Sequence, residues 1–211
     1  MGERAKWGVM TVLAFIIVGY TAALLLLPDL RPSALQARAA DAPLALFAHL
    51  GASAVALALG PFQLSTRLRP RRLGLHRWMG RIYILSVVAG GLSAIALATT
   101  SSGGVPAHAG FGLLGGLWVL TAVIAYQRIR VYDIADHRRW TIRSYSLAFA
   151  AVTLRIYLAL AVGPMRMPFD QAYPAIAWLC WVPNLIVAEW WFLRRSPVSA
   201  HAPAPSDIFA A

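Results

Sequence analysis

Long apolar runs alternate with short polar turns along nearly the whole chain. Each run is close to the roughly 20 residues that a helix needs to cross a hydrocarbon core. The runs span residues 7–27, 43–64, 78–99, 106–126, 140–162 and 173–193. Lipid offers no hydrogen-bond partners to exposed backbone groups, so such runs fold as helices. The pattern therefore predicts an all-α fold, an integral membrane bundle of six helices.

The order of features repeats within the chain, in residues 47–83 and again in residues 106–144. Each copy opens with a histidine in an Ala-His-x-Gly sequence, continues through an apolar run and a basic turn, and closes on His-Arg. His49 thus corresponds to His108, and His76 to His137. Because repeats of this length mark repeated structural units, we predict two helix-turn-helix units that form a four-helix core over residues 43–162.

The remaining segments flank this core. Residues 1–42 are expected to form the first membrane helix and an outer loop, residues 163–195 the sixth helix, and residues 196–211 a disordered cytoplasmic tail rich in Pro, Ala and Ser. A cleaved signal peptide is the alternative for the first helix. Its apolar run is longer than is typical for such peptides, and the small residues at 37–39 lie well beyond it. We therefore expect this helix to be retained.

Composition and charge give the bundle its environment and direction. The chain is 59% hydrophobic and only 13% charged, which is too apolar for a soluble domain of 211 residues. Its net charge of +11 comes from bases in the turns, which favours a role in topology over nucleic-acid binding. The positive-inside bias predicts a bacterial inner-membrane protein with both termini in the cytoplasm. The bases on the predicted cytoplasmic side are Arg4, Lys6, Arg67, Arg69, Arg71, Arg72, Arg77, Arg81, Arg128, Arg130, Arg138, Arg139, Arg143, Arg194 and Arg195.

The predicted topology sorts the histidines into two pairs. His49 and His108 fall near the outer ends of their helices, and His76 and His137 near the inner ends. A b-type haem is held by two imidazoles that face each other across the iron, so each pair is a candidate for the metal ligands of one haem. Glycines would give the porphyrin room against the backbone. They are Gly51, Gly60, Gly90, Gly91, Gly110, Gly112, Gly115 and Gly116. Packing between membrane helices is the alternative role for these glycines.

Arg155 lies inside the fifth apolar run, where a lone charge is costly and tends to be functional. A propionate of the outer haem, a quinone or an anionic substrate would supply its partner. The alternative is a pair with Asp41 or with backbone carbonyls. Arginines near the inner histidines are candidates to hold the propionates of an inner haem, although setting the topology would account for them equally. They are Arg77, Arg81, Arg138 and Arg143.

The clustered motifs resemble the bacterial membrane family called domain of unknown function 2306, over residues 45–160. The resemblance rests on His49 with Gly60-Pro61-Phe62-Gln63, on His76-Arg77 with Gly80-Arg81 and Tyr83, and on His137-Arg138 with Trp140, Arg143-Ser144 and Arg155. In architecture and histidine placement the chain is also similar to the cytochrome b561 family. Those proteins are six-helix electron carriers with two b haems, held between helices two and four and between helices three and five. Motifs of that family for ascorbate have no obvious counterpart here, so the electron donor does not carry over.

Together these features predict a transmembrane electron carrier, an oxidoreductase if it is an enzyme, with one or two b haems and a quinone as a further cofactor. Expected partners are membrane lipid, a quinol or other small reductant, and a redox partner protein or a second copy of the chain. No nucleic acid is expected. The alternatives are a haem-free transporter or channel whose histidines and Arg155 line a polar path, and a structural or assembly subunit of a membrane complex. Copper or zinc fits poorly, because zinc prefers close tetrahedral ligands.

Overall fold

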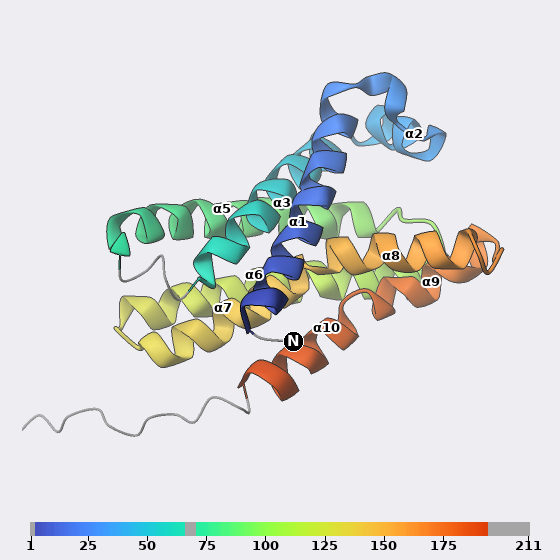
Figure 1. Cartoon of the computed structure of the whole chain (residues 1–211). Helices are drawn as coiled ribbons and strands as arrows, with labels where there is room; N and C mark the ends of the chain where they lie inside the picture. The colour runs from blue at the N-terminus through green and yellow to red at the C-terminus, as the bar shows by residue number, and fades with distance from the viewer. Residues whose placement is uncertain (1–2, 66–70, 194–211) are drawn as a thin grey trace, which may run out of the picture.

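The computed structural model describes residues 3–65 and 71–193, and in these ranges the chain is helical and has no strand (Figure 1). Of the sequence predictions, those on Arg67, Arg69, Arg194, Arg195 and the tail at 196–211 lie outside the described residues. The elements, in chain order, are α1 (Glu3–Leu26), η1 (Pro28–Leu30), α2 (Ser33–Asp41), α3 (Pro43–Gln63), α5 (Leu73–Ala98), α6 (Gly104–Arg130), α7 (Ile134–Ala148), α8 (Ala150–Val162), α9 (Phe169–Leu179), α10 (Val182–Val187) and η2, a π-helix (Ala188–Leu193).

Within the described ranges, five helices are long and apolar enough to cross a membrane: α1, α3, α5, α6, and α7 continued by α8. The sixth predicted run, residues 173–193, is not among them because it is broken into α9, α10 and η2. Pro183, at the start of α10, has no N–H to donate and interrupts the helix beside Trp181. The structure is therefore an all-α membrane protein with five candidate spans, and the sixth span stays a prediction.

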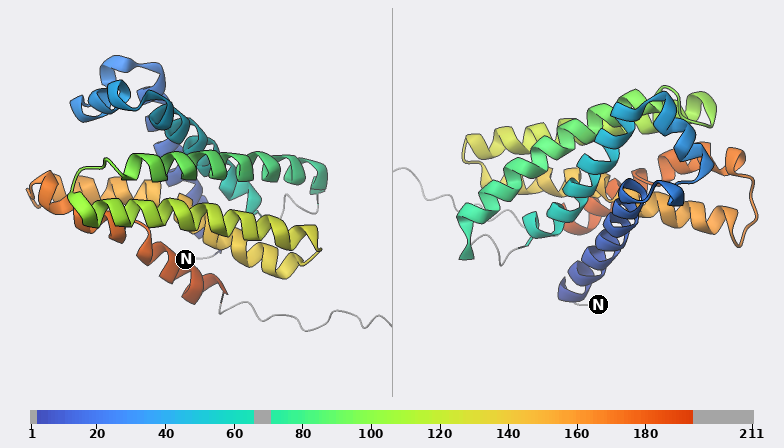
Figure 2. Two further views of the ribbon diagram at one scale, coloured as in Figure 1. Left: turned by 180° about the vertical axis from the view of Figure 1, so that it is seen from behind. Right: turned by 90° about the horizontal axis from the view of Figure 1, so that it is seen from above.

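Successive helices pack against one another: α3 on α5, α5 on α6, and α6 on α7. The last segment returns along the bundle, with α9 against α6 and α8, while α1 packs on α3. Figures 1 and 2 show α1 and α3 crossing the other long helices obliquely. The two repeated sequences thus give two helix pairs, α3 with α5 and α6 with α7, and each pair joins antiparallel neighbours.

The two ends of the bundle differ in charge. One end, called here the arginine-rich end, is where α5 and α7 begin and where α6 ends, and it exposes Arg72, Arg77, Arg130 and Arg138. The indole of Trp7, near the start of α1, donates to the Pro61 carbonyl, so α1 begins at this end too. The opposite end, called the α2 end, carries α2 and the turns that follow α5 and α8.

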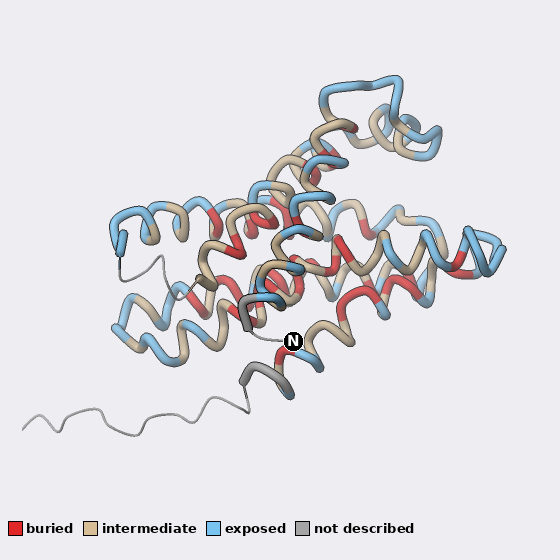
Figure 3. The backbone as a smooth tube through the Cα atoms, in the orientation of Figure 1, coloured by how far each residue is buried: buried red, intermediate tan, exposed pale blue. Residues whose placement is uncertain are grey.

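Buried residues line the space between the helices, whereas the outward faces are apolar and exposed (Figure 3). Leu85 is 70% exposed and Ile16 59% exposed, although each lies in the middle of a long helix. Isolated exposed leucines are ordinary in soluble proteins, but whole apolar helix faces need a cover. In a membrane protein, lipid covers such faces. The exposed apolar faces therefore indicate that these helices are in contact with lipid.

Small residues let α5 and α6 approach closely. A Cβ atom at Gly115 would lie 3.0 Å from the Gly91 carbonyl oxygen and 3.0 Å from Cγ1 of Ile95. Membrane helices commonly use glycine in this way, because packing is their main attraction for each other.

Gly115→Ala is therefore expected to lower stability by about 1 kcal/mol, since the added methyl group meets rigid backbone. Gly116→Ala is the matched control, because nothing lies within 4 Å of a Cβ atom there. Cys180 is fully buried, so thermal unfolding of the detergent-solubilised protein can be followed with a thiol-reactive fluorogenic dye. Equal melting temperatures for the two variants would show that the crossing is looser than described.

Candidate functional site

A small pocket with a mixed polar and apolar lining lies between α1, α3 and α8, toward the α2 end, and is called here the His49 pocket. Its volume is about 40 Å³, enough for a few water-sized groups. Helix α3 contributes the histidine and a hydroxyl, α1 a second hydroxyl, and α8 an arginine. The lining residues are Ile17, Thr21, His49, Leu50, Ser53, Ala54, Leu57, Ala151 and Arg155.

The His49 ring is fixed by a neighbouring helix. Its Nδ1 atom is 2.9 Å from the Gly90 carbonyl oxygen of α5 and 3.3 Å from Oγ of Ser53. A carbonyl oxygen only accepts hydrogen bonds, so Nδ1 carries the proton and Nε2 is the atom with the free lone pair. Gly90 is suited to this contact because a Cβ atom there would come within 2.9 Å of Oγ of Ser53.

Arg155 enters the same pocket without an ionic partner among the described residues. Its Nη1 donates to the Ala151 carbonyl of its own helix at 2.8 Å, and its guanidinium lies 5.5 Å from the centre of the Tyr20 ring. Asp41, the alternative partner considered from the sequence, is exposed and makes no ion pair with it. One carbonyl leaves most of the five N–H donors of a guanidinium available.

His108 does not join this pocket. Its Nε2 donates to the Ser101 carbonyl oxygen at 2.8 Å, in the turn that precedes α6. Helices α3 and α6 each pack against α5 and hardly touch each other, so His49 and His108 come from diagonally opposed helices. The predicted outer pair is thus at one end of the bundle but in two separate environments.

A second pocket, called here the His137 pocket, lies toward the arginine-rich end and has a volume of about 20 Å³. His137 Nδ1 donates to the Ala125 carbonyl at 2.8 Å. The side-chain amide of Gln63 donates to the His76 carbonyl at 3.3 Å, so the backbone of His76 borders this pocket while its ring is not part of the lining. The lining residues are Gln63, Gly80, Tyr83, Ile84, Ala122, Ala125, His137 and Thr141.

A layer of buried tyrosines touches both pockets. The hydroxyl of Tyr83, which lines the His137 pocket, is 2.9 Å from Oγ of Ser144. The hydroxyl of Tyr145 donates at 3.3 Å to the carbonyl of Leu57, which lines the His49 pocket. Tyr83, Ser144 and Tyr145, called here the tyrosine layer, are all less than 5% exposed. The sequence analysis did not single out Tyr145. Gly60, the glycine that makes room for the Tyr145 ring, was the feature of the sequence that could have indicated a large side chain at this position.

The residues present do not fit a porphyrin between either histidine pair. Protein atoms already occupy the space beside the glycines: the Tyr145 ring lies on Gly60, the Trp118 ring and Ser53 on Gly90, and the Ala177 backbone on Gly110. Both pockets are far smaller than a macrocycle.

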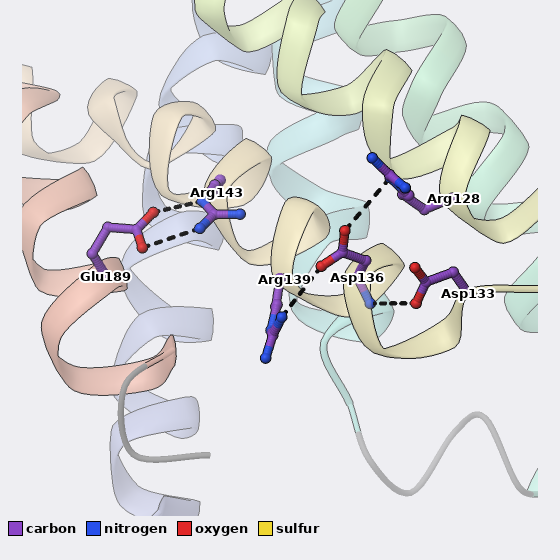
Figure 4. Close-up of polar contacts among 6 residues, drawn as sticks. All are labelled: Arg128, Asp133, Asp136, Arg139, Arg143 and Glu189. Atoms are coloured by element: carbon purple, nitrogen blue, oxygen red, sulfur yellow. Dashed lines mark hydrogen bonds and ion pairs between the residues drawn. The ribbon is translucent and has the colours of Figure 1, made fainter. Parts of the chain in front are cut away.

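The arginines near the inner histidines have protein partners or face outward. Arg143 makes a two-pronged ion pair with Glu189, at 2.5 and 3.1 Å, and lies 4.6 Å from the Trp140 ring centre (Figure 4). Arg77 and Arg138 are exposed, and so is Arg81, which lies 5.6 Å from the Trp78 ring centre. The ion pair between Arg143 and Glu189 ties α7 to η2, so Arg143 serves helix packing in this structure.

Two helix breaks face each other between the fifth and sixth segments. Phe149 separates α7 from α8, and residues 180–181 separate α9 from α10. Asn184 bridges them: its side-chain amide donates to the Ser146 carbonyl at 3.2 Å and to the Cys180 carbonyl at 3.0 Å. The Thr153 hydroxyl also donates to the Cys180 carbonyl. Such side chains satisfy the backbone groups that a break inside a membrane would leave exposed.

Comparison with known proteins identifies the family of the chain but no individual relative. No curated protein and no solved structure matches it, so the likeness in architecture to the cytochrome b561 family gains no support. Residues 46–192, well over half of the chain, match the family described as predicted membrane protein (DUF2306). This range reaches beyond the motifs at residues 45–160 and takes in α9, α10 and most of η2. The chain belongs to the DUF2306 family of membrane proteins.

Proposed function

We propose that this protein is of the transporter or channel class and passes a small ligand with a polar head group between the His49 pocket and the His137 pocket. The carrying observation is the series of pocket, tyrosine layer and pocket along one bundle. Polar groups inside a membrane are costly, and where they gather they usually mark a ligand or ion path. A purely structural subunit has no need of two cavities that each contain polar side chains.

The facing helix breaks support the proposal. Transporters commonly carry interrupted helices near their binding sites, because a break lets one part of a helix move relative to the rest. Here the breaks at Phe149 and at residues 180–181 adjoin the bundle that holds both pockets, and Asn184 joins them through hydrogen bonds. A change of that bonding would shift α8, and with it Arg155, relative to α7.

The positive-inside bias completes the proposal by giving the path a direction. The arginine-rich end would face the cytoplasm of a bacterial inner membrane, together with both termini. The His137 pocket would then be the inner pocket and the His49 pocket the outer one.

The test is electrical. Full-length protein is reconstituted in vesicles on a solid-supported membrane, and currents are recorded on switching to solutions of small organic anions, cations and neutral controls. We expect transient currents for one charge class, absent from empty vesicles. Silence for every class, from protein that is correctly folded and inserted, would contradict transport.

Haem-based electron transfer is the second candidate, because the two histidines of each pair come from different helices and lie toward the same end of the bundle. The packing described above predicts otherwise. We expect protein purified from haem-replete cells to be colourless, with far less than one haem per chain in a pyridine haemochrome assay. A Soret band that is lost in His49→Ala would restore the electron-carrier function.

A further inference from the structure

We infer that the ligand of the His49 pocket is a carboxylate monoanion with an apolar body. This inference deepens the proposed function, because it names the chemical class that the outer pocket of the path would take. It rests on the unused N–H donors of Arg155, on the size of the pocket and on the apolar side chains in its lining.

The charge comes from Arg155. Its guanidinium has a single hydrogen bond, to Ala151, and no carboxylate partner among the described residues. A planar guanidinium offers two parallel N–H groups that match the two oxygens of a carboxylate. The hydroxyl of Ser53 lines the same pocket and can donate to an anion, whereas the hydroxyl of Thr21 already donates to the Ile17 carbonyl. No negative side chain lines the pocket to compete for this role.

The size selects a small head group. The pocket holds about 40 Å³, and one water needs about 10–15 Å³ measured in the same way. About three water-sized groups therefore fit, which matches the carbon and two oxygens of a carboxylate. A phosphate, with five heavy atoms in a tetrahedron, is larger than this space.

The walls select an apolar body. Ile17, Leu50 and Leu57 complete the lining. Ile16 on α1 and Ile156 on α8, each next in sequence to a lining residue, are exposed and apolar. A ligand whose head reaches Arg155 can therefore leave its body between apolar side chains, where burial from water is favourable.

The test uses full-length protein in lipid nanodiscs, with radiolabelled octanoate as the probe and empty nanodiscs as the background. We expect saturable binding of one octanoate per chain. Arg155→Gln should weaken it by at least about tenfold, the loss of a charged hydrogen-bonded pair, whereas Arg155→Lys should keep part of it. Arg166→Gln changes an exposed arginine at the same end and should leave binding unchanged.

Competition separates the chemical classes. Benzoate should displace octanoate, while octylammonium and octanol should not. Equal binding by the Arg155→Gln and wild-type proteins would overturn the inference, as would stronger competition by octyl phosphate than by octanoate. Octanoate binding that depends on Arg155 but gives no current would sink the transport proposal and leave this inference standing. Currents of the same size in the wild-type and Arg155→Gln proteins would support transport and overturn the inference about Arg155.

Discussion

Gly60→Ala is expected to destabilise the protein by about 2 kcal/mol, in the range for overpacking a tight core. A Cβ atom at this position would lie 1.9 Å from two carbons of the Tyr145 ring. That ring cannot simply swing away, because its hydroxyl is bonded to the Leu57 carbonyl and it packs beside Phe149. The melting temperature, followed by labelling of the buried Cys180, should fall by several degrees.

Gly51→Ala provides the control on the same helix, since nothing lies within 4 Å of a Cβ atom there. Alanine also has the higher helix propensity, so Gly51→Ala should be neutral or slightly stabilising. If Gly60→Ala melts at the same temperature as Gly51→Ala, the contact between Tyr145 and α3 is not as described, and the tyrosine layer would lose its link to the His49 pocket.

Tyr83→Phe is the second substitution with a large expected effect. It removes one partner of a fully buried hydrogen bond and leaves the hydroxyl group of Ser144 without the hydrogen bond to Tyr83. Stranding a buried polar atom costs about 1–3 kcal/mol, more than the net worth of the bond itself. The melting temperature should therefore fall although the change removes only one oxygen atom.

The double variant Tyr83→Phe with Ser144→Ala tests whether the two side chains interact. Removing both partners leaves nothing stranded, so the double variant should be more stable than the sum of the single losses allows. Strict additivity would mean that the two side chains do not interact. Tyr126→Phe, which changes an exposed tyrosine at the arginine-rich end, should melt close to the wild type.

Much of the helical framework could be predicted from the hydrophobic pattern. The run at residues 43–64 is α3 (Pro43–Gln63), and the run at 106–126 lies within α6 (Gly104–Arg130). The last run is divided into α9, α10 and η2, and hydropathy gave no sign of this because it counts Pro183 by its polarity and does not register the N–H that it lacks. The helix break at Phe149 left no comparable signal, since no proline or glycine stands there.

The site was predictable only in part. The sequence singled out Arg155 and His49, and both line one pocket. It paired His49 with His108 through the repeat; the two rings lie on helices that both pack on α5, and each ring bonds to a different backbone carbonyl. Tyr145 was missed because its role depends on a contact with Gly60, 85 positions earlier in the chain. Such contacts follow from helix packing, which no local pattern encodes.

If the proposed transport is correct, an organic anion passes through this bundle by way of Arg155. The most direct measurement is the current evoked by benzoate at pH 8, where only about one carboxylic acid in several thousand is neutral, so that diffusion through lipid contributes little. We predict a saturable current from vesicles with wild-type protein, reduced at least several-fold by Arg155→Gln and unchanged by Arg166→Gln. Equal currents from the wild-type and Arg155→Gln proteins, or none above empty vesicles, would contradict the claim.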